Sequence, residues 1–263
     1  MIEFRGVHKI FDEEPVLTDV SFKIVQGETK IILGESGSGK STILKLILGL
    51  IQPESGQILI ENQDITRLMD QELVPIRKNI GMVFQEGALF DSLSVRENVG
   101  YRLFEEAKMM ESEIEAEVLK LLGFVGLEEA IDKMPAELSG GMKRRVGIAR
   151  ALVGTPKVIL YDEPTAGLDP ITKRTIVELM IKLRDLEGVT SVFVTHDLHA
   201  ASTIATEYAA VDGNGRIEFK SEKDSVSHLN INFIMLQEGK VCFEGNYKEL
   251  MDSKHPYIQQ FVS

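Results

Sequence analysis

Short apolar runs alternate with segments of helical periodicity along most of the chain. The runs are rich in Val, Ile and Leu and have the length of buried strands. They lie at residues 16–25, 29–33, 57–61, 80–84, 158–161 and 189–195. Between them, apolar residues recur at helical spacing over residues 41–50, 97–122, 142–152 and 172–186. Strands that alternate with helices predict an α/β fold with a mostly parallel sheet.

The middle of the chain differs from its two flanks. Residues 97–122 are rich in Glu, Met, Leu and Lys, and they contain no Gly or Pro after Gly100. We therefore expect a helical subdomain over residues 87–157, inserted between an N-terminal part (1–86) and a C-terminal part (158–263) of one core. No linker is long or polar enough to indicate independent domains.

Composition narrows the class of protein. The 263 residues include 29 basic and 41 acidic side chains, a net charge of −12, so we expect no nucleic-acid partner. A single cysteine, Cys242, excludes a disulfide scaffold and a Cys-based zinc site. The longest apolar stretch (43–51) contains Lys45 and is too short to span a bilayer, and residues 1–5 lack signal-peptide character. Composition alone predicts a cytosolic protein without a membrane role of its own.

A glycine-rich loop follows the strand at 29–33. Residues 34–41 (GESGSGKS) fit the pattern G-x-x-x-x-G-K-[ST]. Its glycines let backbone N–H groups surround phosphates, and the helix that follows presents its N-terminus to the anion. Lys40 is expected to reach the β- and γ-phosphates, and the Ser41 hydroxyl to bind Mg²⁺. A chance glycine-rich turn is the alternative, which the preceding strand and following helix disfavour.

A later apolar run ends in two carboxylates, Asp162 and Glu163. Both side chains can reach the edge of a site at the end of a strand. Asp162 is expected to hold Mg²⁺, directly or through water, and Glu163 to orient and deprotonate an attacking water. Such a strand end is, on its own, usually a solvated terminus. The phosphate loop earlier in the chain favours the catalytic interpretation.

Between these motifs, residues 138–141 (LSGG) resemble the signature sequence of ABC-transporter ATPases. Further motifs of that family follow in order: Gln85 resembles the Q-loop glutamine, residues 166–169 (AGLD) resemble the D-loop, and His196 resembles the switch histidine. The resemblance covers essentially the whole chain. It implies a P-loop NTPase core of the RecA-like type with an antiparallel β subdomain and a helical subdomain.

The resemblance also implies an ATPase that uses ATP and Mg²⁺. In this family the catalytic residues would be Glu163, His196 and Gln85, and the metal-binding residues Ser41, Gln85 and Asp162. The residues expected to bind ATP are Phe11, Gly34, Glu35, Ser36, Gly37, Ser38, Gly39, Lys40, Ser41 and Thr42. Phe11 stands where the family has an aromatic ring that stacks on adenine, although a phenylalanine taken alone is more often a core residue.

The signature implies a second copy of the chain. In this family Ser139, Gly140 and Gly141 act on the ATP bound by a partner, and Asp169 belongs to the D-loop. We therefore expect a C2 homodimer with two ATP molecules between its subunits. The family also docks integral-membrane permease subunits near the Q-loop, here in residues 86–100, which would hold the protein on the cytoplasmic face of the inner membrane.

Two stretches, 86–99 and 138–146 (LSGGMKRRV), resemble the ATPases of Mla/Mce-type systems, which move phospholipids or other lipids between the membranes of diderm bacteria. This implies lipid transport and an Mce-domain lipid-binding partner. A solute importer, for example of amino acids, is the alternative. A soluble ABC ATPase would carry a second ATPase unit or a coiled coil, and a non-hydrolysing module would lack Glu163 or His196. The basic run Lys143-Arg144-Arg145 is interpreted as a solvated helix face rather than a headgroup or nucleic-acid patch.

The chain departs from the family pattern after the switch histidine. Residues 208–217 and 233–241 each look like a strand–turn–strand unit, and 212–215 (DGNG) form a strong turn signal. The family has one such unit there. We therefore expect an extra surface hairpin or loop around residues 213–232, away from the ATP site.

Overall fold

The computed structural model describes residues 1–221 and 229–262. Within these residues the main sheet has six strands in the order β12-β11-β3-β8-β7-β6. Five of them run parallel and β12 pairs antiparallel at one edge. They are β3 (Thr29–Leu33), β6 (Ile80–Val83), β7 (Val158–Asp162), β8 (Thr190–Thr195), β11 (Ile231–Gln237) and β12 (Lys240–Gly245). The predicted α/β fold with a mostly parallel sheet is confirmed.

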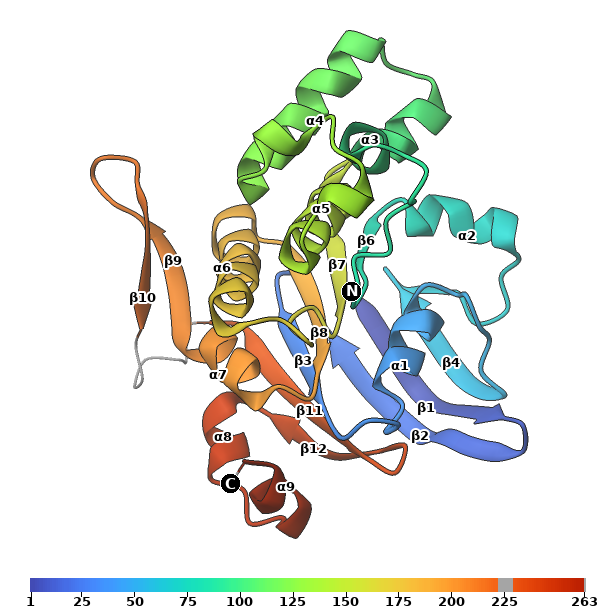
Figure 1. Cartoon of the computed structure of the whole chain (residues 1–263). Coiled ribbons are helices and arrows are strands. Elements are labelled where there is room, and N and C mark those ends of the chain that lie inside the picture. Colours follow the sequence, from blue (N-terminus) through green and yellow to red (C-terminus); the bar gives the residue numbers. More distant parts are fainter. Residues whose placement is uncertain (222–228, 263) are drawn as a thin grey trace.

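Both faces of this sheet are covered, which explains the continuous apolar runs. Ile31 and Leu33 of β3 belong to the core on one face, whereas Ile32 belongs to the core on the other. The first core packs beneath α5 (Gly140–Leu152), α6 (Pro170–Glu187), α7 (Leu198–Thr206), α8 (Tyr247–Met251) and α9 (Pro256–Val262). The second core lies between the main sheet and α1 (Lys40–Ile47) (Figure 1).

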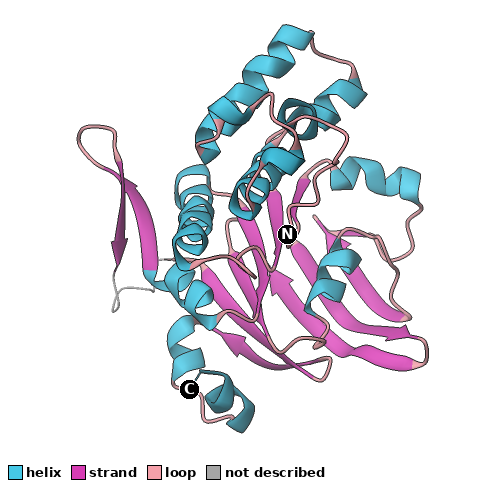
Figure 2. Ribbon diagram, viewed as in Figure 1, coloured by secondary structure: helices cyan, strands magenta, loops and turns pink. Residues whose placement is uncertain are grey.

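A second, antiparallel sheet packs on α1 from the other side. Its order is β2-β1-β4-β5, and Figure 2 shows it beside the main sheet. The strands are β1 (Ile2–Phe11), β2 (Glu14–Ile24), β4 (Ser55–Ile60) and β5 (Gln63–Asp64), and α2 (Asp70–Arg77) follows. The rings of Phe4 and Phe22 stack with centroids 4.6 Å apart inside the shared core. This is the antiparallel β subdomain that the resemblance implied, although β1 was not predicted from its own pattern.

The helical region contains α3 (Val95–Glu106) and α4 (Glu111–Val125), followed by α5. The run of helical periodicity over residues 97–122 forms two helices, because α3 ends before Ala107, which has a left-handed φ of 46°. The break lets α4 turn back against α3. Gly100 permits the close contact, since a Cβ there would lie 3.2 Å from a methyl group of Ile114 and of Val118. The division of the chain at residues 86/87 and 157/158 stays a prediction.

A two-stranded sheet stands away from the main sheet (Figure 1). It pairs β9 (Glu207–Val211) with β10 (Ile217–Ser221), and the Asp212 carboxylate closes the turn by accepting from the backbone N–H groups of Asn214 and Arg216. The second hairpin-like stretch, 233–241, belongs to the core, because β11 pairs with β3. Of the segment expected around 213–232, residues 222–228 lie outside the described residues.

A buried ion pair joins the far end of the main sheet, where β3 begins. Lys30 Nζ lies 2.8 Å from Glu28 Oε1 and 2.9 Å from Glu244 Oε1 of β12. The side chains of Lys30 and Glu28 are each 3% exposed. Val25 N–H and Asn232 Nδ2 donate to the Glu28 carboxylate as well. A buried charge with this many partners stabilises the sheet only while its counter-charge is present.

Lys30→Met is expected to lower the free energy of unfolding by about 3 kcal/mol, because it leaves the Glu28 carboxylate buried without its cation. Urea denaturation measures the change. The control is Arg5→Met, which removes the cation of an exposed pair with Glu3 and is expected to change stability little. Equal small losses in the two variants would contradict a structural role for the buried pair.

Candidate nucleotide-binding and catalytic site

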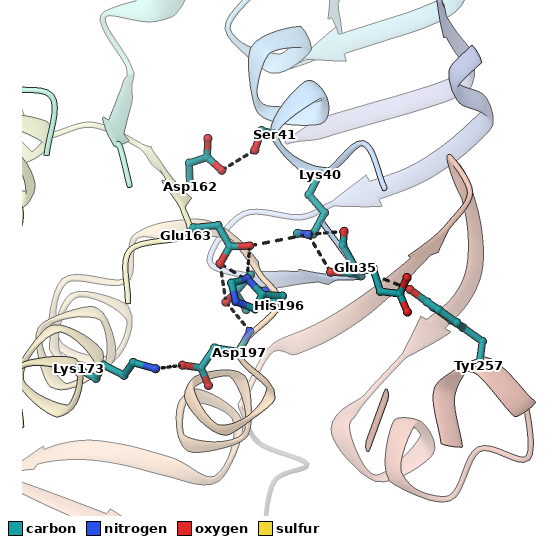
Figure 3. A network of polar contacts seen from close by, with 11 residues as sticks. Glu35, Lys40, Ser41, Asp162, Glu163, Lys173, His196, Asp197 and Tyr257 are labelled. Atoms are coloured by element: carbon teal, nitrogen blue, oxygen red, sulfur yellow. Dashed lines mark hydrogen bonds and ion pairs between the residues drawn. The ribbon is translucent and has the colours of Figure 1, made fainter. Parts of the chain in front are cut away.

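Strand register brings the site together at one edge of the main sheet. Leu33 of β3 pairs with Thr195 of β8, and Val194 of β8 pairs with Asp162 of β7. The carboxyl ends of the three parallel strands therefore lie at the same level. Asp162 at the end of β7 and the segments that follow the three strands, which carry Lys40, Ser41, Glu163 and His196, meet in one network (Figure 3).

The glycine-rich loop folds around the ammonium group of Lys40. Lys40 Nζ donates to the carbonyl oxygens of Gly34 (2.8 Å) and Glu35 (2.9 Å), and the residue is only 6% exposed. Burial lowers the pKa of Lys40, and the charges of Glu163 and Asp162 oppose this effect. The ammonium is therefore held at the base of the loop, where a phosphate can approach it.

The loop fits a phosphate in two further respects. Ser38 Oγ is buried and has no hydrogen-bond partner among the described residues. A Cβ at Gly34 would lie 2.6 Å from Leu236 O and from Ser38 Oγ, so the backbone approach there requires glycine. Gly39 has a φ of 99° at the N-terminus of α1, which opens the first helical turn toward the loop. An unpartnered hydroxyl beside the N-terminus of a helix suits an anionic oxygen.

Ser41 and Asp162 provide an oxygen donor set. Ser41 Oγ donates to Asp162 Oδ1 at 2.7 Å. Burial raises the pKa of Asp162, while the hydrogen bond from Ser41 lowers it. A hydroxyl and a carboxylate are ligands that Mg²⁺ accepts, so these two residues fit the expected metal.

The Glu163 carboxylate lies at the centre of the network. His196 Nδ1 is 2.9 Å from Glu163 Oε1, and Lys40 Nζ is 3.8 Å from the same oxygen. Thr195 Oγ1 donates to Glu163 Oε2 at 3.1 Å. Glu163 adopts a left-handed φ of 47°, and non-glycine residues in that region cluster at functional sites. The backbone thus directs this carboxylate toward the phosphate loop.

A hollow of about 370 Å³ opens over these groups. Gln85 and Phe11 line it together with residues of the loop, Lys40, Ser41, Thr42 and Glu163. Phe11 is 41% exposed, so the interpretation as a core residue is wrong. Lys9 Nζ lies 4.8 Å from the centre of the Phe11 ring.

The signature residues occupy a different place. Ser139 caps α5 by accepting a hydrogen bond from Met142 N–H, and Gly141 packs on Thr172, whose methyl carbon would lie 2.3 Å from an added Cβ. Among the described residues, neither Ser139 nor Gly141 lines the hollow over the phosphate loop. Gly140 instead lines a separate hollow of about 390 Å³.

Asp169 caps α6. Its carboxylate accepts from the backbone N–H groups of Ile171 and Thr172, and from Thr172 Oγ1 at 2.6 Å. These hydrogen bonds, with the Thr172 hydroxyl first, lower the pKa of Asp169. The carboxylate is therefore ionised and fixed at the start of the helix.

Two residues near the site could not be predicted from the sequence. The Tyr257 hydroxyl of α9 accepts from Glu35 N–H (3.2 Å) and lies 3.4 Å from Leu236 O, so the C-terminal helix supports the phosphate loop (Figure 3). Lys173 Nζ binds Asp197 Oδ2 at 2.8 Å, next to His196. Neither contact joins neighbours in the sequence, so no local pattern signals them.

The interpretation of residues 143–145 as a solvated face is wrong for Arg144, which is 6% exposed. Its Nε donates to Gln85 O and its Nη2 donates to Ala166 O. A run of three charged residues did not reveal that Arg144 is buried, because the helix directs only this one of the three side chains inward.

Within residues 1–221 and 229–262, no helix combines the length and apolar character needed to cross a membrane.

Comparison with known proteins identifies the family. The family model described as "ABC transporter" matches residues 17–166. "Protein TRIGALACTOSYLDIACYLGLYCEROL 3, chloroplastic" of Arabidopsis thaliana is 40% identical over an alignment covering 100% of this chain and 73% of the relative. The methionine import ATP-binding protein MetN of Vibrio cholerae is 39% identical over 87% of this chain and 67% of the relative.

A mycobacterial relative and a solved structure support the same family assignment. The probable ribonucleotide transport ATP-binding protein mkl of Mycobacterium leprae is 42% identical over 77% of this chain, which spans only 58% of that relative. The structure described as the dimeric post-hydrolysis state of the ATP-binding cassette MJ0796 bound to ADP and Pi superimposes with a TM-score of 0.77 at 34% identity, covering 94% of this chain and 98% of that one. The chain therefore belongs to the ABC transporter family and is an ATPase that binds and hydrolyses ATP with Mg²⁺.

Proposed function

We propose that this chain is the ATP-hydrolysing subunit of an ABC transporter that moves lipids between membranes. The observation that supports lipid rather than solute most directly is the match to the plastid relative. That protein bears the name of a lipid, and its alignment includes all of this chain. The methionine importer aligns with 87% of the chain. The motifs at 86–99 and 138–146 support the same choice.

A solute importer is the second candidate. The similarity to the methionine import protein is close to that of the plastid relative, at 39% against 40% identity. Both candidates share the ATPase chemistry proposed here and differ in the cargo and in the partners that deliver it.

We propose the following roles for the residues around the phosphate loop. Lys40 and the loop N–H groups bind the β- and γ-phosphates, and Ser38 Oγ gains the partner it lacks. Ser41, Asp162 and Gln85 hold Mg²⁺, which when bound neutralises charge on the phosphates. Phe11 lines the same hollow, and its ring stacks on the adenine in this proposal.

Hydrolysis is proposed to depend on Glu163. Its carboxylate orients the attacking water and accepts a proton from it. Three donors fix the position of this carboxylate: His196 Nδ1, Thr195 Oγ1 and His196 N–H. His196 therefore links the Glu163 carboxylate to the end of β8. In this proposal the His196 side chain also contacts the γ-phosphate.

A second copy of the chain is proposed to complete each site. Ser139, Gly140 and Gly141 form the N-terminus of a 13-residue helix, and among the described residues they do not line the chain's own phosphate-loop hollow. A helix N-terminus opened by serine and glycine favours an anion. The dimer reported for the similar cassette supports a pair in which each signature closes on the partner's ATP, with Asp169 beside it.

Permease subunits are proposed to bind at residues 86–100, with an Mce-domain protein as a further member of the complex. Phe90 and Tyr101 are 46% and 40% exposed, and their rings lie 4.8 Å apart. Exposed aromatic residues next to the Q-loop suit a protein contact. Through it the ATPase would lie on the cytoplasmic face of the inner membrane.

Glu163→Gln is expected to lower ATP turnover by about 10²- to 10⁴-fold, because the amide cannot accept the proton of water. ATP affinity is expected to stay close to that of the wild type, since the phosphate contacts remain. Steady-state phosphate release and equilibrium binding of ATP measure the two quantities. Glu187→Gln, at the exposed end of α6, is the control. Near-normal turnover of Glu163→Gln would exclude Glu163 as the base.

Affinity purification of the native membrane complex tests the cargo. We expect a permease and an Mce-domain protein to co-purify, together with bound phospholipid detected by mass spectrometry. A complex that contains a solute-binding protein for an amino acid and no enriched lipid would support the importer and contradict lipid transport.

A further inference from the structure

We propose that Arg144 is a positioning residue that joins Gln85 in the Q-loop to Ala166 in the D-loop and thereby couples the two ATP sites of the dimer. This role deepens, and rests on, the proposed ATP-sandwich dimer. The basic run at residues 143–145 did not indicate that one of its side chains is buried and has such a role.

The contacts of Arg144 span three segments. Its side chain leaves the second turn of α5 and is 6% exposed. Nε donates to the backbone carbonyl of Gln85, and Nη2 donates to the backbone carbonyl of Ala166. A guanidinium group is planar and donates in fixed directions, so two acceptors on one such group are held at a set separation. Neither loop can shift alone without breaking a charge-assisted hydrogen bond.

On the Q-loop side, the backbone of α5 touches the loop directly. A Cβ at Gly87 would lie 2.8 Å from Lys143 O, and one at Gly147 would lie 3.3 Å from Gly87 Cα. Arg150 adds donors to Gly87 O (2.9 Å) and Ala88 O (2.8 Å). The Q-loop is therefore attached to α5 along two turns of the helix.

On the D-loop side, the start of α5 rests on the start of α6. Gly141 abuts the Thr172 methyl group, and the Thr172 hydroxyl binds the Asp169 carboxylate. The signature and the D-loop thus form one block. The guanidinium of Arg144 connects this block to the Q-loop.

One donor of Arg144 is left over. Nη1 is buried and has no hydrogen-bond partner among the described residues. An unpaired buried donor is destabilising, so a small shift of α5 that gives Nη1 an acceptor would be favourable. The neighbouring Glu86 carboxylate opposes the lowering of the Arg144 pKa that burial causes, so an acidic acceptor lies near.

Arg144 connects segments that belong to two different ATP sites of the proposed dimer. Gln85 lines the hollow of the chain's own phosphate loop, whereas Ser139 and Asp169 are proposed to act on the partner's ATP. A group that ties Gln85 to the signature–D-loop block therefore transmits occupancy of one site to the other. Such a coupling appears as cooperativity in ATP.

The test uses Arg144→Met and Arg144→Lys in the full chain, with Arg145→Met as the matched control. Arg145 lies on the same helix and also donates to two backbone carbonyls, those of Val125 (3.0 Å) and Gly126 (3.2 Å), which belong to the end of α4. Arg145→Met therefore removes a similar pair of hydrogen bonds but leaves the contacts of the Q-loop and the D-loop unchanged. ATP hydrolysis is measured against ATP concentration, and thermal denaturation is recorded for each variant.

Arg144→Met is expected to lower the Hill coefficient for ATP from about 2 toward about 1, while Arg145→Met keeps the wild-type value. Arg144→Lys keeps a buried positive charge but not the planar fork, so it is expected to lose cooperativity while losing less stability than Arg144→Met. If Arg144→Met does not fold, Arg144→Lys provides the result.

Retention of cooperativity in both Arg144 variants would overturn the proposal and leave the dimer intact. An equal loss in Arg145→Met would also overturn it, because the effect would then follow from helix stability alone. A wild type whose rate depends hyperbolically on ATP would show that the two sites are not coupled and would overturn this role of Arg144, whereas a chain that stays monomeric with Mg·ATP bound would contradict the proposed dimer itself.

Discussion

The in-register pairing of three parallel strands determines where every charged group of the ATP site lies. β3, β8 and β7 end at one level, since Leu33 pairs with Thr195 and Val194 pairs with Asp162. This register places the phosphate loop, the two carboxylates and the histidine close together at one edge of the sheet. A one-residue slip of β7 would exchange the faces of Asp162 and Glu163 and separate the metal ligand from Ser41. The apolar cores on both faces of the sheet prevent such a slip.

Close backbone contacts at glycines connect the helical region to this part of the core. Gly87, Gly141 and Gly147 bring α5 against the Q-loop and the start of α6. Arginines of α5 then donate hydrogen bonds to backbone carbonyl groups of these loops. The helix that carries the signature is therefore attached to the parts of the core that surround the nucleotide. ATP that binds at one edge of the sheet can in this way affect the position of the helix that carries the signature.

The central strands were predictable because their burial on both faces leaves continuous apolar runs, as in Thr29–Leu33. β1 was missed because it is buried on one face and interrupted by polar residues. The break at Ala107 has no local signal, since a left-handed alanine depends on the packing of α3 against α4. Site residues within contiguous motifs could be named from the sequence. Tyr257 and Arg144 could not, because their partners lie far away in the chain and their roles arise only from tertiary contacts.

The most direct test of this account is the structure of the Glu163→Gln variant with Mg·ATP. We expect a symmetric pair in which the phosphates lie within hydrogen-bond distance of Lys40 and Ser41 of one copy and of Ser139 of the other. ATP bound away from Lys40, or an ATP-saturated protein in which Ser139 contacts no nucleotide, would contradict it.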